Sequence, residues 1–266
     1  MDTEPTVLGC IANEESMRRL LVINPNTSTR ISKIIESLVR DEAAGEADVL
    51  MATAPFGFSY ISTRVAVSIA AHAVLDAAAE ALAKGAAPDA ILLACFGDPG
   101  REALAELTGL PVIGFAEAGL LAAAALPGTS LVATNGAVWC EMLSELILKL
   151  GIVDKIVGVR SIEEAGDEPD AIAGFLAREA KATGAARVVL GGAGLIPSLP
   201  QIIAAAHVPI IDPHREAVRK ALRLAASPQT AMLPSISVPN GVMETFGLSP
   251  VLSAALRTHN GAERKH

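Results

Sequence analysis

Residues 92–100 read Leu92-Leu93-Ala94-Cys95-Phe96-Gly97-Asp98-Pro99-Gly100. This apolar run, followed by glycine and proline, predicts a buried strand that ends in a tight turn carrying one cysteine. Residues 188–195 repeat the pattern as Val188-Val189-Leu190-Gly191-Gly192-Ala193-Gly194-Leu195, with Gly192 standing 97 positions after Cys95. The repeat predicts a duplicated α/β unit, and therefore two similar lobes that face each other across a cleft.

The rest of the chain alternates short apolar runs with stretches of helical spacing or high alanine content. Such alternation is typical of parallel sheets covered by helices, so we expect an α/β protein. The predicted strands are residues 19–23, 47–52, 89–94, 111–114, 130–133, 156–159, 187–190 and 208–211. The predicted helices include residues 61–84, 101–108, 137–150, 171–183 and 214–226.

This pattern also predicts how the lobes divide along the chain. We expect residues 18–116 to form the first lobe and residues 117–226 the second. Residues 227–266 are expected to complete the first lobe, because their mixed patterning is that of a segment packing back onto it. Residues 1–17 show no clear period and are expected to be an N-terminal extension.

Composition narrows the class of protein. Hydrophobic residues make up 51% of the 266 residues and aromatic residues only 3%, so the core must consist of aliphatic side chains, as in parallel α/β proteins. The net charge of -8 argues against nucleic acid as a partner, because binding to phosphates needs clustered Lys and Arg. Charged residues, glycine or proline interrupt the apolar stretches before about 18 residues, so we expect no membrane association.

The cysteines and the first residues bear on location. The opening 17 residues lack the basic segment of a secretory signal. The three cysteines, Cys10, Cys95 and Cys140, are few and irregularly spaced, which fits a reducing compartment better than a disulfide framework. We therefore expect a cytoplasmic protein.

Cys95 is the strongest candidate for chemistry. It ends a buried strand where the next helix is expected to begin, and a helix N-terminus favours the thiolate, the form that can take a proton. The competing interpretation is a small buried core residue, as free cysteines often are. Cys140 lies inside a predicted helix beside Trp139, and we expect it to serve packing.

Other segments predict ligand contacts. The run Gly191-Gly192-Ala193-Gly194 fits neither the dinucleotide fingerprint nor the P-loop, and we expect its amides to line a pocket and hold an anionic or carbonyl oxygen. Polar loops follow two strands, at Asn24–Ser28 and at Thr134-Asn135-Gly136, on the sheet edge where parallel sheets bind ligands. The five histidines lack metal-ligand spacing, so no metal is expected. His214 begins a predicted helix and is interpreted as a cap at the protein surface.

Four segments together resemble the hydantoin and allantoin racemase branch of the aspartate/glutamate/hydantoin racemase superfamily. They are Ile23-Asn24-Pro25-Asn26-Thr27-Ser28, Ala94-Cys95-Phe96-Gly97-Asp98-Pro99, Gly114-Phe115-Ala116-Glu117-Ala118 and Leu190-Gly191-Gly192-Ala193-Gly194-Leu195. The resemblance extends over about residues 19–255. It implies two flavodoxin-like lobes with parallel sheets and a cofactor-free active site between them. It also implies a homo-oligomer that acts on a small carbonyl or carboxylate substrate.

In such racemases one cysteine from each lobe flanks the substrate's α-carbon, and one removes a proton as thiolate while the other returns a proton on the opposite face. Carried over by position, the resemblance makes Cys95 one acid/base and places the second cysteine's position at Gly192. It implies that the substrate is bound by Asn24, Asn26, Phe96, Gly97, Thr134, Asn135, Ala193 and Gly194.

Gly192 has no side chain that could exchange a proton, which leaves three hypotheses. The leading one is racemase-type proton transfer by Cys95 at the carbon next to a carbonyl, in a hydantoin or a related small carbonyl acid. The second is decarboxylation or isomerisation of a substituted malonate-like diacid by Cys95 alone, because loss of carbon dioxide creates the carbanion without a base. The third is a non-catalytic small-molecule binder that keeps the cleft. A separate possibility, beside these three, is that His214 or a bound water replaces the missing acid.

Overall fold

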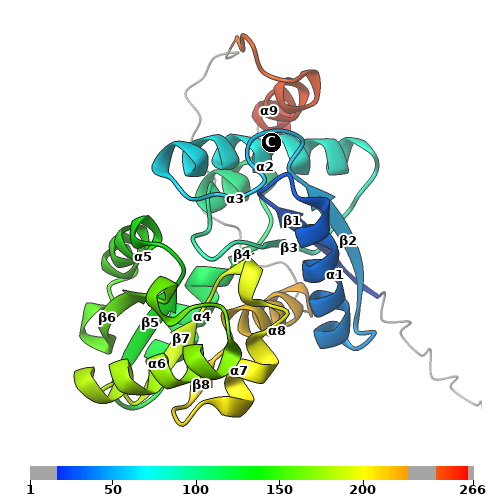
Figure 1. Ribbon diagram of the computed structural model, residues 1–266. Helices are drawn as coiled ribbons and strands as arrows, with labels where there is room; N and C mark the ends of the chain where they lie inside the picture. Colours follow the sequence, from blue (N-terminus) through cyan, green and yellow to red (C-terminus); the bar gives the residue numbers. More distant parts are fainter. Residues whose placement is uncertain (1–16, 227–243, 263–266) are drawn as a thin grey trace, which may run out of the picture.

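The computed structural model describes residues 17–226 and 244–262, and it has two four-stranded parallel sheets (Figure 1). The strand order is β2-β1-β3-β4 in one sheet and β6-β5-β7-β8 in the other. The two orders are the same when the strands of each sheet are counted from its first. The predicted α/β class and the two similar lobes are confirmed. The predicted extension, with Cys10, lies outside the described residues.

The strands follow the apolar runs of the sequence. The first sheet consists of β1 (Arg18–Asn24), β2 (Ala47–Thr53), β3 (Ala90–Leu93) and β4 (Val112–Gly114). The second consists of β5 (Ser130–Thr134), β6 (Ile156–Ser161), β7 (Arg187–Leu190) and β8 (Ile210–Ile211). In register, Ile23 of β1 pairs with Leu93 of β3, and Ala133 of β5 pairs with Leu190 of β7. The two glycine-containing turns therefore follow equivalent strands, β3 and β7, each at the carboxyl edge of its own sheet.

Helices cover both faces of each sheet. In the first lobe they are α1 (Thr29–Ala43), α2 (Arg64–Ala83), α3 (Arg101–Thr108) and α4 (Phe115–Ala124). The helices that follow along the chain are α5 (Ala137–Lys149), α6 (Pro169–Thr183), α7 (Leu199–Ala205), α8 (Pro213–Ala226) and α9 (Pro250–Ala262). Single 3-10 turns are η1 (Val153–Lys155), η2 (Glu163–Ala165) and η3 (Ala193–Leu195).

Alternation along β1 shows how the layers form. Successive side chains of a strand point to opposite faces. Leu20 and Val22 belong to the core cluster that includes side chains of α1 and α8, whereas Leu21 and Ile23 belong to the cluster with α2 and α3. All four are fully buried. A run without polar residues is thus required, because neither face of the strand meets water.

The core between the lobes is continuous. One cluster joins α1, α4 and α8 to β5, β7 and α5, and α4 and α8 lie between the two sheets (Figure 1). Helix α8 belongs by its place in the chain to the predicted second lobe, yet it packs against β1, β3 and β4 of the first sheet. The two lobes are therefore held by a shared apolar layer, and the division at residue 226 stays a prediction.

Helix α9 packs against α2 and α3 on the outside of the first lobe (Figure 1). The Oγ of Ser249, just before α9, donates a hydrogen bond to Oδ1 of the buried Asp76 in α2 at 2.6 Å. Residues 227–243, which lead to this helix, lie outside the described part of the chain. Within that part, α2 is long and apolar enough by composition to span a membrane, but 44% of its most apolar window is buried inside the protein.

Candidate active site

A cavity of about 250 Å³ lies between the carboxyl edges of the two sheets. Both lobes line it, and it brings together most of the site residues predicted from the sequence. Those are Asn26, Cys95, Phe96, Thr134, Asn135, Gly192, Ala193 and Gly194. The two turns of the repeat, the first around Cys95 and the second around Gly192, thus meet at one cavity. Sheet topology places each turn at the carboxyl edge of its own sheet, and the apolar layer shared by the lobes joins the two sheets.

The Cys95 turn is tightly folded. The Ala94 N–H donates to the Ile23 carbonyl at 2.9 Å, which extends the sheet by one residue. The N–H groups of Gly97 and Asp98 then donate to the Cys95 carbonyl at 3.0 and 3.4 Å. Asp98 adopts φ 50°, and its carboxylate accepts the N–H groups of two residues in the first turn of α4, at 3.0 and 2.7 Å. The cysteine is therefore held at the cavity wall by a rigid backbone.

The protonation state of Cys95 differs from the expectation. Burial, together with the negative charge of Asp98, raises the pKa of the Cys95 thiol well above its usual range. Burial also raises the pKa of Asp98 to about 7. Helix α3 begins only at Arg101, six residues after Cys95, so Cys95 is not in the first turn of that helix. At neutral pH Cys95 is therefore mostly in its thiol form.

The second turn is built on glycine. The Gly191 N–H donates to the Ala133 carbonyl at 3.1 Å, and Gly192 adopts φ 147° and ψ 125° before η3 begins at Ala193. This φ is one that residues with a side chain rarely adopt. The N–H groups of Ala193 and Gly194 stand in the first turn of η3, where no earlier carbonyl of that helix can accept them. They are available to an oxygen in the cavity.

Aromatic rings pack each turn against the opposite lobe. The Phe96 ring lies so close to Gly191 that a Cβ there would be 2.4 Å from it, and the Trp139 ring would be 2.0 Å from a Cβ on Gly97. The Trp139 Nε1–H donates to the Ile61 carbonyl across the cleft at 2.9 Å. Glycine at these positions is required by close approach, and the contacts hold the two turns facing each other.

Comparison with known sequences assigns the chain to a protein family. Residues 20–221 match the sequence model of the Asp/Glu/hydantoin racemase family. The chain belongs to this family. It is 30% identical over 218 residues to a hydantoin racemase from Paenarthrobacter aurescens, covering 78% of this chain and 91% of that protein.

Solved structures agree with that assignment. The allantoin racemase from Pseudomonas fluorescens is 26% identical with a TM-score of 0.74, over 86% of this chain and 100% of that one. The allantoin racemase from Klebsiella pneumoniae is 28% identical with a TM-score of 0.71, over 79% and 88%. The protein is an isomerase of the racemase type, and the predicted racemase branch is confirmed.

Two predicted binding residues of this racemase lie behind the cavity wall. Asn24 is fully buried, and its Nδ2 donates to Asn26 Oδ1, the Ser28 carbonyl and Ser32 Oγ at 3.1, 3.2 and 3.0 Å. It shapes the loop that carries Asn26 and does not line the cavity. The Oδ1 of Asn26 accepts from Asn24 and from the Ser28 N–H, so Nδ2 is the group that Asn26 can offer a ligand. Gly97 is covered by Trp139.

The racemase cavity also has wall residues that sequence reasoning did not assign. They are Ile31, Ser59, Tyr60, Ile61, Ala94, Trp139, Asp167 and Leu195. The loop at residues 55–60, before α2, gave a usable signal. Its aromatic residues and glycine predict a loop that overhangs the carboxyl edge of the first sheet. Burial, and after it the charges of Glu163 and Cys95, raise the pKa of Tyr60, which stays protonated. Asp167 lies in an exposed loop between β6 and α6, where no pattern points to a site.

His214 of the racemase corrects the sequence interpretation. It was expected as a surface cap, but its side chain is fully buried behind the second turn. Its Nδ1 lies 2.8 Å from Asp212 Oδ1, and its ring meets Phe115 edge to face with centroids 4.9 Å apart. Asp212, not His214, caps α8, accepting the backbone N–H groups of His214 and Arg215 at 3.0 and 3.4 Å. No metal-binding group of His, Cys, Asp or Glu occurs within residues 17–226 and 244–262.

Proposed function

We propose that this racemase exchanges the proton at C5 of a small, neutral, 5-substituted hydantoin, with Cys95 as the acid/base on one face of the ring. The observation that carries the proposal is that Cys95 lies on the wall of an interlobe cavity that Ala193 and Gly194 of the second turn also line. Similarity to a hydantoin racemase supports the same substrate class.

The charge of the cavity favours a neutral ligand. None of the described residues that line it is lysine, arginine or histidine, and Asp167 is its acidic side chain. A dicarboxylate would have to leave water without a cation to pair with, which is costly in a partly closed cavity. A hydantoin ring instead offers N–H donors and carbonyl acceptors, which match Asn26, Thr134 and Asn135. Apolar walls from Ile31, Ile61 and Trp139 would accept the C5 substituent.

The proposed chemical step takes place at C5 of the hydantoin and at the oxygen of the adjacent carbonyl. The Cys95 thiol first loses its proton to solvent. The thiolate so formed takes the C5 proton and becomes a thiol again, and the C–H electron pair moves onto the adjacent carbonyl to give an enolate. The N–H groups of Ala193 and Gly194 would stabilise the enolate oxygen. C5 then regains a proton from the Cys95 thiol on the same face, or takes one from a water molecule on the opposite face, where Gly192 leaves room. In the second case the hydroxide left behind is neutralised by the proton that Cys95 has taken. Return from the opposite face inverts the centre.

Single enantiomers of 5-methylhydantoin and 5-benzylhydantoin in deuterated water test the proposal. We expect deuterium at C5 by NMR together with loss of optical rotation. Cys95→Ser should lower the exchange rate by about 100-fold or more, the usual contribution of a positioned acid/base. Exchange with retained rotation would overturn the part played by water. Neither exchange nor loss of rotation, or an unchanged rate in Cys95→Ser, would overturn the whole proposal.

A pair of substrates matched in size but not in charge tests whether the cavity prefers a neutral ligand. A hydantoin with a carbamoylmethyl group at C5 and one with a carboxymethyl group have nearly the same size and differ by one negative charge. Because Asp167 lies on the wall and no lining residue within the described chain is cationic, the amide should have the lower KM. An equal or lower KM for the acid would show that a cation reaches the cavity.

One observation favours a second candidate, decarboxylation. A resting thiol is the form that protonates a carbanion, and the raised pKa of Cys95 keeps that form at neutral pH. Loss of carbon dioxide from a disubstituted malonate leaves such a carbanion, and Cys95 would then be the proton donor without a second base. Release of carbon dioxide from 2-methyl-2-phenylmalonate, abolished in Cys95→Ser, would support this activity. The absence of release alongside hydantoin exchange would exclude it.

A further inference from the structure

His214 makes a contact that the proposed proton transfer does not use. Its Nε2 accepts the backbone N–H of Gly192 at 3.4 Å, while Nδ1 meets Asp212 Oδ1 at 2.8 Å. Gly192 can only donate through its N–H, so Nε2 must hold a lone pair. An ionised carboxylate can only accept, so Nδ1 must hold the hydrogen. The two partners together therefore fix one neutral tautomer of a fully buried imidazole.

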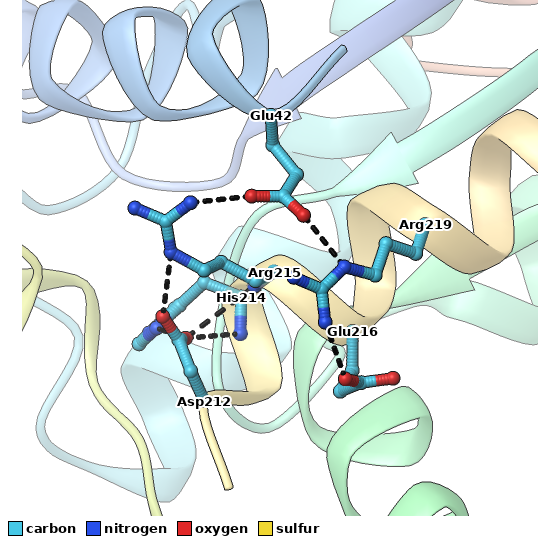
Figure 2. Close-up of polar contacts among 6 residues, drawn as sticks. All are labelled: Glu42, Asp212, His214, Arg215, Glu216 and Arg219. Atoms are coloured by element: carbon cyan, nitrogen blue, oxygen red, sulfur yellow. Dashed lines mark hydrogen bonds and ion pairs between the residues drawn. The ribbon is translucent and has the colours of Figure 1, made fainter. Parts of the chain in front are cut away.

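Asp212 is itself held from several directions. Burial opposes its ionisation, but hydrogen bonds from the His214 ring and from the backbone of α8 lower the pKa of Asp212. Arg215 Nε adds an ion pair to Asp212 Oδ2 at 3.4 Å. Figure 2 shows Arg215 and Arg219 meeting Glu42, which comes from α1 of the first lobe; the Arg219 Nε to Glu42 Oε1 distance is 2.6 Å. A line of contacts thus joins α1 to the second turn.

The ring has no freedom to turn away. Phe115 meets it edge to face, and the adjacent Pro213 packs on Gly119 of α4, where a Cβ would lie 2.3 Å from the proline Cβ. The Gly192 N–H at the base of the second turn therefore meets a closely packed imidazole. Gly192 lies on the cavity wall, but His214 does not.

We propose that His214, oriented by Asp212, is the positioning residue that holds Gly192 and the second turn in place opposite Cys95. This inference rests on the proposed function. At φ 147° the Gly192 peptide has few local interactions that favour its conformation, and the Nε2 lone pair supplies one. Without that acceptor the buried N–H would lack a partner, and the turn would relax toward another conformation. The N–H groups of Ala193 and Gly194 would then leave the enolate oxygen.

Two substitutions separate the two ends of the imidazole. Asn in place of His214 can keep the donor to Asp212 but is too short to reach Gly192. Gln can place its carbonyl oxygen near the position of Nε2 and so keep the acceptor. We expect His214→Asn to lower kcat for hydantoin exchange by about 10- to 100-fold, as misplacement of about 1 Å does, with KM changed less than about threefold. His214→Gln should retain kcat within about threefold of wild type.

His207 provides the matched control. It is exposed, lies between α7 and β8, and its replacement by Asn or Gln should leave kcat unchanged. Equal kcat in His214→Asn and His214→Gln, both near wild type, would overturn the proposal. Large and equal losses in both, with native circular dichroism, would also overturn it, because they would assign proton transfer to the imidazole itself.

Measurements without turnover keep the inference separate from the proposed function. In ¹⁵N-labelled protein, exchange of the Gly192 amide should be faster in His214→Asn than in His214→Gln, whether or not hydantoins react. If wild type shows no hydantoin exchange but this order holds, the proposed function fails and the positioning role stands. Wild-type imidazole ¹⁵N shifts read the same bond without a substitution. A hydrogen on Nε2 there would overturn the proposal even if both variants failed to fold.

Discussion

A side chain at Gly192 should destabilise the protein through the backbone, whatever its chemistry. The residue adopts φ 147°, outside the range that residues with a Cβ prefer. A Cβ there would stand 3.6 and 3.8 Å from Leu195 atoms, which is ordinary van der Waals contact. The added atom therefore fits, and strain at φ is the main term. We expect Gly192→Ala and Gly192→Cys to lower the free energy of unfolding by about 1–3 kcal/mol.

Gly194 offers a control two residues away. It also lines the cavity, but it has no positive φ, and a Cβ on it would meet nothing within 4 Å. Gly194→Ala should be neutral or should stabilise by about 0.4–1 kcal/mol, because alanine loses less chain entropy on folding. Urea unfolding followed by circular dichroism measures both changes. The melting temperature should fall by about 2–4 °C for each kcal/mol lost.

The stabilities of the Gly192 and Gly194 variants together test whether backbone strain at residue 192 causes the loss. If Gly192→Ala and Gly194→Ala are equally stable, φ at residue 192 is not constrained and the reasoning fails. If Gly192→Cys is much less stable than Gly192→Ala, the thiol meets an obstacle beyond Cβ. The expected pattern is equal loss for Ala and Cys. It would mean that a cysteine at this position requires a rearranged second turn and not only a new side chain.

Further predictions concern the thiol, the junction of the lobes and the cleft. Burial raises the Cys95 pKa, so the thiol is still mostly protonated at about pH 8 and its thiolate fraction keeps increasing above that pH. We therefore expect kcat/KM for hydantoin exchange to rise about tenfold per pH unit from about pH 8 to about pH 9.5. A plateau of kcat/KM in that range would contradict this expectation. Gly119→Ala would place its Cβ 2.3 Å from that of Pro213 and should lower the free energy of unfolding by about 1–3 kcal/mol in urea, whereas unchanged stability would show that α8 can shift freely. Trp139→Phe removes the donor to the Ile61 carbonyl and should lower the free energy of unfolding by about 1 kcal/mol. It should also raise KM for the hydantoin, and an unchanged KM would show that this hydrogen bond does not hold the cleft closed.

Sequence reasoning predicted the parts of the fold that depend on local pattern. The central residues of β1, β3, β5 and β7 form aliphatic runs that are fully buried, so the sequence pattern indicates their burial directly. Because parallel strands end at one edge, the Asn26 loop and the Cys95 turn were expected to meet there, and the cavity brings both together. Helix α4 was missed as a helix. It is almost entirely apolar, since both sheets cover it, and so it lacks amphipathic spacing.

Local pattern could not predict how long-range contacts treat each polar group. Asn24 and Asn26 are chemically alike and two positions apart, yet one is consumed by the loop's own hydrogen bonds and the other faces the cavity. The same limit applies to the protonation of Cys95. A strand-end cysteine before a helix suggests a thiolate, but the raised pKa depends on burial and on Asp98 in the folded chain.

The two turns of the repeat have taken different roles. On the first, the Cys95 side chain is the proposed acid/base, and the backbone makes local hydrogen bonds to the Cys95 carbonyl. On the second, Gly192 has no side chain, and its backbone is fixed from outside by the buried imidazole of His214. Both turns also have partners outside themselves: Asp98 accepts N–H groups from α4, and Gly192, whose peptide is conformationally free, donates to His214. The buried His214–Asp212 pair is therefore the structural counterpart of glycine at residue 192, and the two positions should be changed together in any attempt to rebuild the second turn.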